Sequence, residues 1–81
     1  MTGGRMSDHN VKPGRYRHFK GQSYIVLGVA LHSETQEVMI VYQQDYGDRR
    51  MWVRPKAMFL ETVQVDGKSV PRFQFLGEVH V

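Results

Sequence analysis

The sequence contains no cysteine, so neither a disulfide nor a cysteine-based metal site can stabilise the fold. Four histidines, at positions 9, 18, 32 and 80, are scattered and show no spacing typical of metal ligands, so we expect no metal. Eighty-one residues provide for one domain. Because so short a chain buries only about 60–65% of its unfolded surface, stability must come from apolar packing, with self-association as a further source.

Long apolar segments and phosphate-binding loops are also missing. The longest apolar run, residues 25–31, includes Gly28 and is far shorter than the roughly 18 residues that span a membrane. The first six residues lack the apolar middle of a signal peptide. Neither a Gly-x-Gly-x-x-Gly nor a Gly-x4-Gly-Lys-Ser/Thr pattern occurs. We therefore expect a cytoplasmic protein with no membrane contact and no cofactor.

The net charge of +3 is unevenly distributed. Residues 1–20 carry five basic side chains and one acidic side chain, whereas residues 21–81 carry six basic and seven acidic ones. The positive excess therefore lies in the leader and the first predicted strand. A basic arm of this kind can contact phosphates, although a solvated tail explains the same pattern.

Strand-forming segments separated by turn residues predict an all-β domain of five to six short antiparallel strands. The predicted strands cover residues 15–19, 23–32, 37–43, 50–54, 62–65 and 68–75. Pro55 suits the start of a helical or 3₁₀ turn over residues 56–59. Asp66-Gly67 suits a two-residue type I′ hairpin, whose register would place Glu61 opposite Arg72 as an ion pair. We predict a disordered leader over 1–12, a domain over 13–76 and a frayed tail over 77–81.

The second and third strands carry apolar side chains on both faces. Strict alternation would direct Tyr24 and Val26 to one side of the sheet, and Ile25, Leu27 and Val29 to the other. An open sheet with one solvated face would instead alternate apolar and polar residues. The pattern therefore predicts strands that bend round a small SH3-like barrel. A sheet-mediated homodimer is the alternative explanation.

Several motifs in this order resemble those of the bacterial domain-of-unknown-function family numbered 1653. The resemblance covers roughly residues 13–75 and rests on residues 14–21, 24–30, 32–35, 41–42, 46–47, 52–55, 58–59 and 71–73. It implies a compact cytosolic bacterial domain. The family has no established activity, so the resemblance implies none for this chain.

Two short segments contain candidate ligand-binding residues. His32-Ser33-Glu34-Thr35 offers an imidazole, a carboxylate and two hydroxyls within one turn, but such residues also stabilise turns by bonding backbone amides. Trp52 and Arg54 should share one face of a strand. An indole beside a guanidinium is a common recognition pair, whereas a lone tryptophan in a small domain is often a core residue.

Aromatic side chains predict a binding groove of the SH3 type, and the residues chosen for it are Tyr16, Tyr42, Tyr46 and Trp52. Phe19, Phe59 and Phe73 are assigned to the core. Our first hypothesis is a non-catalytic module that binds a peptide or a nucleic-acid strand through this groove and Arg54, with His32 and Glu34 at its rim. The alternative is a small enzyme that acts on a polar or nucleotide-like substrate with His32, Glu34 and Arg54.

Overall fold

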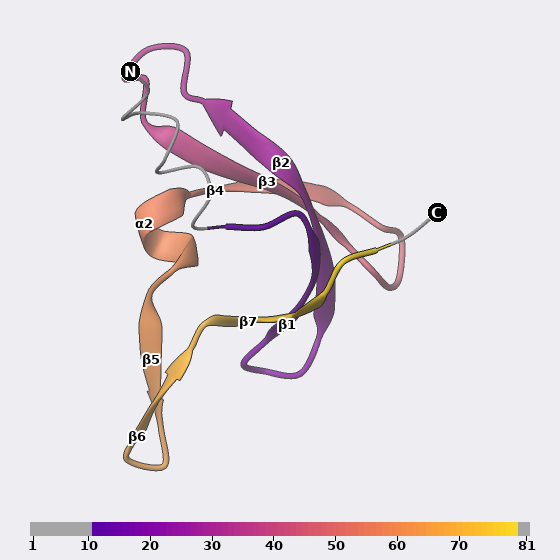
Figure 1. Ribbon diagram of the computed structural model, residues 1–81, viewed down its shortest axis with the longest axis vertical. Helices are drawn as coiled ribbons and strands as arrows, with labels where there is room; N and C mark the ends of the chain where they lie inside the picture. Colours follow the sequence, from indigo (N-terminus) through magenta and orange to yellow (C-terminus); the bar gives the residue numbers. More distant parts are fainter. Residues whose placement is uncertain (1–10, 80–81) are drawn as a thin grey trace.

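The computed structural model describes residues 11–79 and contains seven strands and one short helix. The strands are β1 (Gly14–His18), β2 (Ser23–Leu31), β3 (Val38–Gln44), β4 (Met51–Pro55), β5 (Thr62–Val65), β6 (Lys68–Pro71) and β7 (Phe73–Gly77), and helix α2 (Lys56–Phe59) follows β4. Five strands form an antiparallel main sheet in the order β4-β3-β2-β1-β7, while β5 and β6 form a separate hairpin (Figure 1). The all-β prediction is confirmed.

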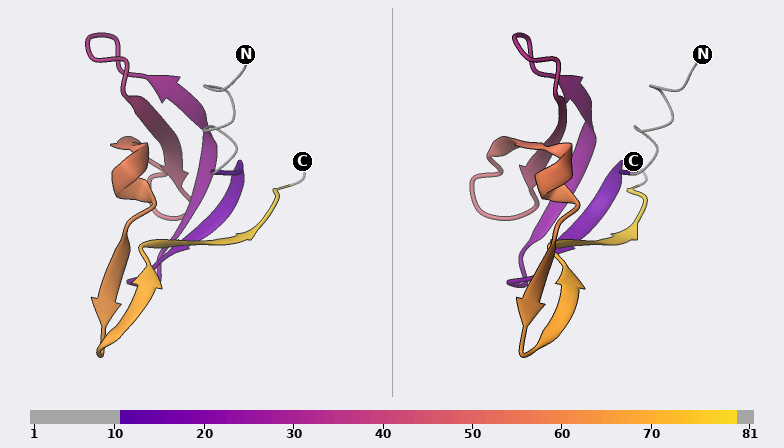
Figure 2. Two further views of the ribbon diagram at one scale, coloured as in Figure 1. Left: turned by 60° about the vertical axis from the view of Figure 1, so that its left-hand side comes forward. Right: turned by 90° about the vertical axis from the view of Figure 1, so that its left-hand side faces the viewer.

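The core lies on one side of the main sheet, which we call the inner face. Its buried apolar side chains are Val11, Tyr16, Val26, Ile40, Tyr42, Phe59 and Phe73. Helix α2 and the β5–β6 hairpin lie on this same side (Figure 2). The Phe59 ring of α2 stacks on the Phe73 ring of β7, with centroids 4.2 Å apart and planes within 3°. Helix α2 therefore closes the core through one aromatic side chain.

A β-bulge at Leu27 reverses the alternation of side chains along β2. Val26 pairs with Tyr42, and the next pair is Gly28 with Val41, so Leu27 is an extra residue. Beyond the bulge Val29 pairs with the fully buried Ile40 and therefore shares the inner face. Strict alternation was consequently wrong from Gly28 onward, because one inserted residue moves every following side chain to the opposite face.

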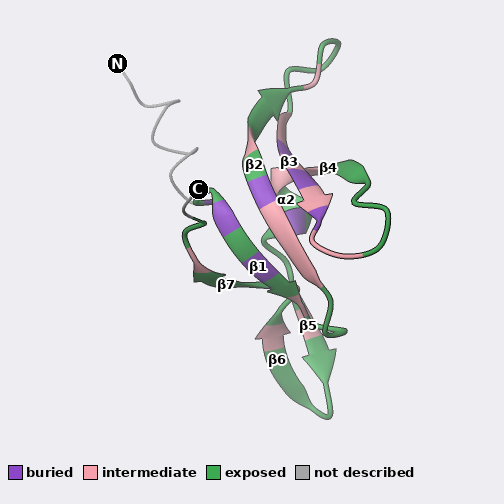
Figure 3. Ribbon diagram, turned by 90° about the vertical axis from the view of Figure 1, so that its right-hand side faces the viewer, coloured by how far each residue is buried: buried purple, intermediate pink, exposed green. Residues whose placement is uncertain are grey.

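The main sheet is open and does not close into a barrel. Strands β4 and β7 are its two edges, and within residues 11–79 they do not pair with each other. Nothing in this part of the chain covers the outer face, which is turned toward the viewer in Figure 3. Leu27 and Val53 are 46% and 60% exposed there. The predicted burial on both faces is therefore not achieved by a single chain, because its helix and second hairpin both lie on the inner side.

Local predictions in the second half of the chain are confirmed. Asp66 and Gly67 both have positive φ, 52° and 79°, as a type I′ turn requires. Arg72 donates to Glu61 through Nη2 and Oε1 at 3.1 Å, which is the predicted ion pair. The predicted strand over 68–75 is interrupted at Arg72, since the backbone of this residue bonds to Glu61 and Phe19 instead of continuing a ladder.

One residue of the predicted leader packs into the core. Val11 is 3% exposed and belongs to the core cluster. The rest of the predicted leader, residues 1–10, and the end of the predicted tail, residues 80–81, lie outside the described residues. Among residues 11–79, no helix has the length and apolar character to cross a membrane.

Candidate functional site

Strand β4 directs Trp52 and Arg54 to the inner face, because Trp52 pairs with Tyr42 and Arg54 pairs with Ile40, and both partners are buried. The prediction that Trp52 and Arg54 share a face is confirmed by this register. They lie at the margin of the aromatic core, where the sheet ends. We define the inner-face site by the polar and aromatic side chains that meet here: His18, Tyr24, Tyr42, Tyr46, Trp52 and Arg54.

Arg54 is half-buried and is held by two aromatic residues. Its Nε donates to the Tyr42 hydroxyl at 3.3 Å, and its guanidinium carbon lies 5.9 Å from the Phe73 ring centroid. Four other arginines each form an ion pair with a carboxylate: Arg15, Arg49, Arg50 and Arg72. No carboxylate between positions 11 and 79 pairs with Arg54. Its two terminal nitrogens are consequently available to an anionic group.

Trp52 offers an exposed ring whose orientation is fixed. Its side chain is 46% exposed, while the indole Nε1 donates to Gln44 Oε1 at 2.9 Å. Gln44 is itself buried, and its amide nitrogen donates to Asp48 Oδ1 at 3.4 Å and to the Tyr46 carbonyl at 3.5 Å. A ring held at its polar edge and open elsewhere can stack against a planar ligand with little loss of side-chain entropy.

Two tyrosine hydroxyls lie on the same side of the sheet. The hydroxyls of Tyr24 and Tyr46 are 3.0 Å apart, and the Tyr24 ring makes edge contacts with Tyr42 and Phe73 at centroid distances of 5.4 and 5.7 Å. Burial, together with the hydrogen bond to Tyr46, raises the pKa of Tyr24 to about 12. The Tyr24 phenol therefore stays neutral at physiological pH and adds no negative charge beside Arg54.

His18 lies among aromatic rings next to the cationic groups. Its ring is 4.9 Å from Phe73 and 4.6 Å from Phe19, and its Nδ1 accepts a hydrogen bond from the Lys20 backbone at 3.2 Å. Burial lowers the pKa of His18, and the nearby Arg72, Arg54 and Lys20 side chains lower it further. The neutral imidazole is therefore favoured, with its proton on Nε2.

The lowered pKa of His18 makes stability depend on pH. The unfolded chain binds this proton more readily than the folded chain, so the contribution of neutral His18 is complete above the ordinary histidine pKa of about 6.5. It is lost as the pH falls through the lower pKa of the folded state. We expect His18→Gln to flatten the dependence of the unfolding free energy on pH between 7 and 5, as measured by urea denaturation.

The matched control for this prediction is Gln74→Ala, which changes an exposed residue of β7 and removes no titratable group. We expect this variant to keep the pH dependence of the unmodified protein. An equal slope for the His18 variant and the unmodified protein would contradict the prediction.

Two residues assigned to the binding groove are core residues instead. Tyr16 and Tyr42 are only 6% and 5% exposed. Tyr16 donates its hydroxyl to the Lys12 carbonyl at 2.8 Å, whereas the Tyr42 hydroxyl accepts from Arg54. Both rings were placed at a wet surface because tyrosine carries a polar end, but local partners satisfy that end inside the fold. Phe19, assigned to the core, is 36% exposed.

His32 and Glu34 do not join the inner-face site. The His32 Nδ1 accepts hydrogen bonds from the backbone amides of Glu34 and Thr35, at 3.1 and 3.4 Å, which is the turn-stabilising alternative. In the pairing of β2 with β3 and β4, His32 lies three residues beyond Val29, the residue in the same row as Arg54. This separation is about 10 Å along the strand. No hydrogen bond joins His32, Glu34 and Arg54 to one another in the described structure.

Sequence reasoning missed His18, Tyr24 and Gln44 as members or supports of the site. Tyr24 shares the core-facing side of β2 with Val26, and this pattern was visible in the sequence. The position of Gln44 beside Trp52 depends on pairing across three strands and was not visible.

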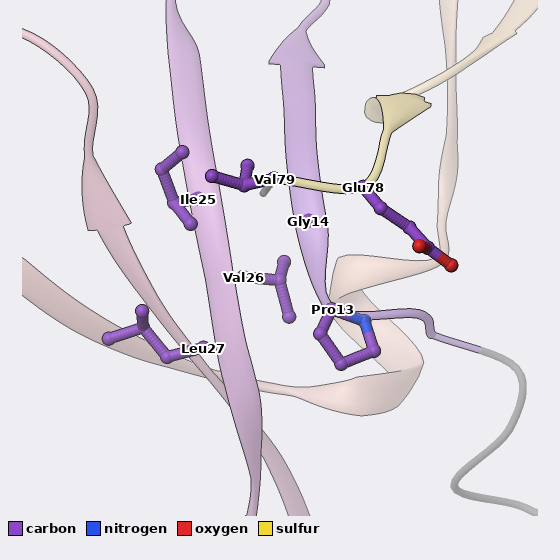
Figure 4. A pocket seen from close by; sticks show the side chains of 7 residues that line it. All are labelled: Pro13, Gly14, Ile25, Val26, Leu27, Glu78 and Val79. Atoms are coloured by element: carbon purple, nitrogen blue, oxygen red, sulfur yellow. The ribbon is translucent and has the colours of Figure 1, made fainter. Parts of the chain in front are cut away.

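Among residues 11–79, the structure also contains hollows that do not include Arg54. One of about 430 Å³ lies beside β2 (Figure 4), and one of about 220 Å³ lies between β1 and the β5–β6 hairpin.

These features define a small antiparallel β domain in which an arginine without a carboxylate partner among residues 11–79 shares a strand face with an exposed tryptophan. Residues 14–75 match the family described as protein of unknown function (DUF1653), and the chain belongs to that family. A crystal structure of a DUF1653 protein from Bordetella bronchiseptica is similar, with a TM-score of 0.81 and 37% sequence identity. The similarity covers 91% of this chain and 97% of the other. Among curated proteins, none matches the chain significantly.

Proposed function

We propose that this domain is a non-catalytic binding module that holds single-stranded nucleic acid on its inner-face site. Arg54 binds a phosphate, and the exposed ring of Trp52 stacks on a base. The observation that carries the proposal is the half-buried Arg54 guanidinium, which has an aromatic support and no carboxylate partner among residues 11–79. Partial burial of an arginine is unfavourable unless a partner is present, and a bound phosphate supplies one.

The arrangement of charge supports an anionic ligand in preference to a neutral one. Besides burial, Arg72, Arg54 and Lys20 each lie close enough to His18 to lower its pKa. The Glu61 carboxylate is already engaged by Arg72 at 3.1 Å. An unpaired cation next to an open aromatic ring is the combination that proteins use to bind single strands with little sequence preference.

The spacing along β4 favours a nucleotide over an isolated phosphate. Trp52 and Arg54 are two residues apart on the same face, which separates their side chains by about 7 Å. One ligand must therefore present a planar group and an anion at a similar separation, and a nucleotide within a strand does so. The Arg54 Nε donates to the Tyr42 hydroxyl. The two terminal nitrogens therefore form the pair of donors that can make parallel hydrogen bonds to phosphate oxygens.

The test is a titration of the full chain with a fluorescently labelled 12-nucleotide homopolymer of RNA or DNA. Trp52 is the single tryptophan of the chain, so its emission reports directly on the site. We expect the oligonucleotide to quench Trp52 emission and raise the label anisotropy. Both effects should weaken steeply as the salt concentration rises, because the release of counterions from the phosphates then favours binding less. Flat signals from both probes at about 50 mM salt would contradict the proposal.

Arg54→Gln should weaken oligonucleotide binding about tenfold, because a charge-assisted hydrogen bond contributes roughly 1.5–3 kcal/mol. It should also reduce, by about one, the slope of the logarithm of the binding constant against the logarithm of the salt concentration. The matched control is Arg17→Gln. Arg17 also lacks an ion pair with residues 11–79, but it is exposed, and its pairing with Ser23 and Gln74 places it on the outer face. Equal losses in the two variants would indicate general electrostatic attraction, and salt-insensitive binding of an acidic peptide would indicate a peptide module instead.

A further inference from the structure

The outer face of the main sheet is an apolar surface formed by adjacent residues of β2, β3 and β4. Strand register arranges these residues in three rows across the strands. The first row is Ile25, Gln43 and Met51, the second is Gly28, Val41 and Val53 with Leu27 in the bulge beside them, and the third is Ala30, Met39 and Pro55. Gln43 is the one polar residue in the array, and no member is charged. We call this array the outer face patch.

The patch is well exposed at both borders. Met51 and Val53 on β4 are 59% and 60% exposed, and Leu27 on β2 is 46% exposed. Figure 3 shows β2 and β3 with no other element in front of them. From the spacing of strands and of same-face residues, the array measures about 14 by 20 Å. A continuous apolar area of this size on a sheet face indicates an interaction surface.

Within residues 11–79, no other element lies over the centre of the patch. Helix α2 and the β5–β6 hairpin lie on the opposite side of the sheet (Figure 2). At the β2 border, Glu78 and Val79 line the hollow beside Ile25 but leave Leu27 46% exposed. The described part of the chain therefore leaves the patch open to another molecule.

We infer that a second copy of this chain covers the patch, so that two main sheets pack face to face as a homodimer. A two-fold axis that runs along β3 between the sheets would place β4 of each copy over β2 of the other. The exposed Met51 and Val53 side chains would then lie near the hollow of about 430 Å³ that is lined in part by Pro13, Ile25 and Leu27 (Figure 4). Each copy would thus offer both contacting elements, as a two-fold interface requires.

The composition of the patch agrees with this occupant. A standard interface buries about 800 Å² on each partner, and the array of about 14 by 20 Å corresponds to roughly a third of that area. The uncharged array would supply the apolar centre of such an interface, and homodimer interfaces are the most apolar class. A nucleic-acid strand would find no cation in the array. The dimer would also explain why β2 and β3 are apolar on both faces, because their outer face would be buried only when two copies associate.

The first test is the molar mass of the full chain in solution, measured by light scattering and sedimentation between about 1 and 500 µM, a range chosen to bracket the micromolar affinities common for interfaces of this size. We expect twice the 9.4 kDa chain mass at the upper concentrations and dissociation on dilution. Val53→Glu should raise the dimer dissociation constant about 100-fold, because it places a charge within the apolar contact. Val65→Glu is the matched control, since Val65 is 38% exposed on the β5–β6 hairpin, and it should leave the dimer unchanged.

A second test locates the interface independently of any loss of folding. The chain has no cysteine, so Val41→Cys introduces one thiol near the inferred axis. Packed sheets are about 10 Å apart, so a bismaleimide of that span should join two copies, whereas a cysteine at Val65 should not be joined. A monomer at every concentration, or a dimer that persists in Val53→Glu, would overturn the inference. Oligonucleotide binding by a Val53→Glu monomer would show that the inner-face site is independent of the dimer.

Discussion

Replacement of Phe59 by alanine should remove most of the stability of this domain. Phe59 is 1% exposed and is stacked on Phe73 at 4.2 Å, with edge contacts to Tyr16 and Tyr42 at 5.4 and 5.7 Å. Truncation of a buried phenylalanine costs about 3–5 kcal/mol, because apolar contacts are lost and a cavity remains. Domains of this size are stable by only about 4–12 kcal/mol, so we expect a much lower urea midpoint.

The neighbouring Leu60 provides the control for this prediction. Leu60 directly follows α2 and is 45% exposed, so Leu60→Ala should change the unfolding free energy by less than about 1 kcal/mol. Both variants should be compared at one protein concentration, because self-association would add to apparent stability. Similar losses in the two variants would show that α2 does not close the core through Phe59.

A second large effect is expected for Gly14→Ala, at the start of β1. Gly14 has φ of 140°, and an added Cβ would lie 2.5 Å from the Gly77 carbonyl oxygen and 3.1 Å from the Phe75 ring. A positive φ at a residue other than glycine costs about 1–3 kcal/mol of backbone strain. The overlap with backbone atoms of the adjacent strand β7 adds a similar amount. We expect a loss of more than about 3 kcal/mol, together with faster hydrogen exchange of the β7 amides.

Gly21→Ala separates the two causes of this loss. Gly21 also has positive φ, 107°, but nothing lies within 4 Å of its added Cβ. This variant should show the conformational strain alone, so its unfolding free energy should fall by about 1–3 kcal/mol, and β7 should remain protected. If the two variants lost equal stability, close contact between β1 and β7 would not be what requires glycine at position 14.

Predictions that depended on near neighbours in the sequence were accurate. The pair Asp66-Gly67 was sufficient to define the β5–β6 hairpin and its register, and therefore also the Glu61–Arg72 ion pair. Pro55 and the residues after it correctly located α2. Such features depend on backbone conformations that a few residue types adopt at little cost, so composition over two to four positions is informative.

Predictions about which side chains are exposed were less accurate, because they needed strand pairing. The extra residue at Leu27 changed the face of Val29, and strict alternation could not show this shift. Tyr16 and Tyr42 lie in the core since their hydroxyls find partners in Lys12 and Arg54, one near in the chain and one distant. In the candidate site, alternation alone placed Trp52 with Arg54 and Tyr24 with Val26, whereas the positions of His18 and Gln44 depended on strand pairing.

The amino-acid sequence by itself determined that this chain forms short antiparallel strands, where its tight turns lie, and that two adjacent strands are apolar on both sides. Tertiary structure alone decided that the sheet stays open, which of its faces α2 and the second hairpin cover, and that no carboxylate of residues 11–79 pairs with Arg54. The physical reason is the distance along the sequence between the residues that interact. Turn and strand preferences arise from dihedral angles of neighbouring residues, whereas burial and charge pairing depend on which strands lie side by side.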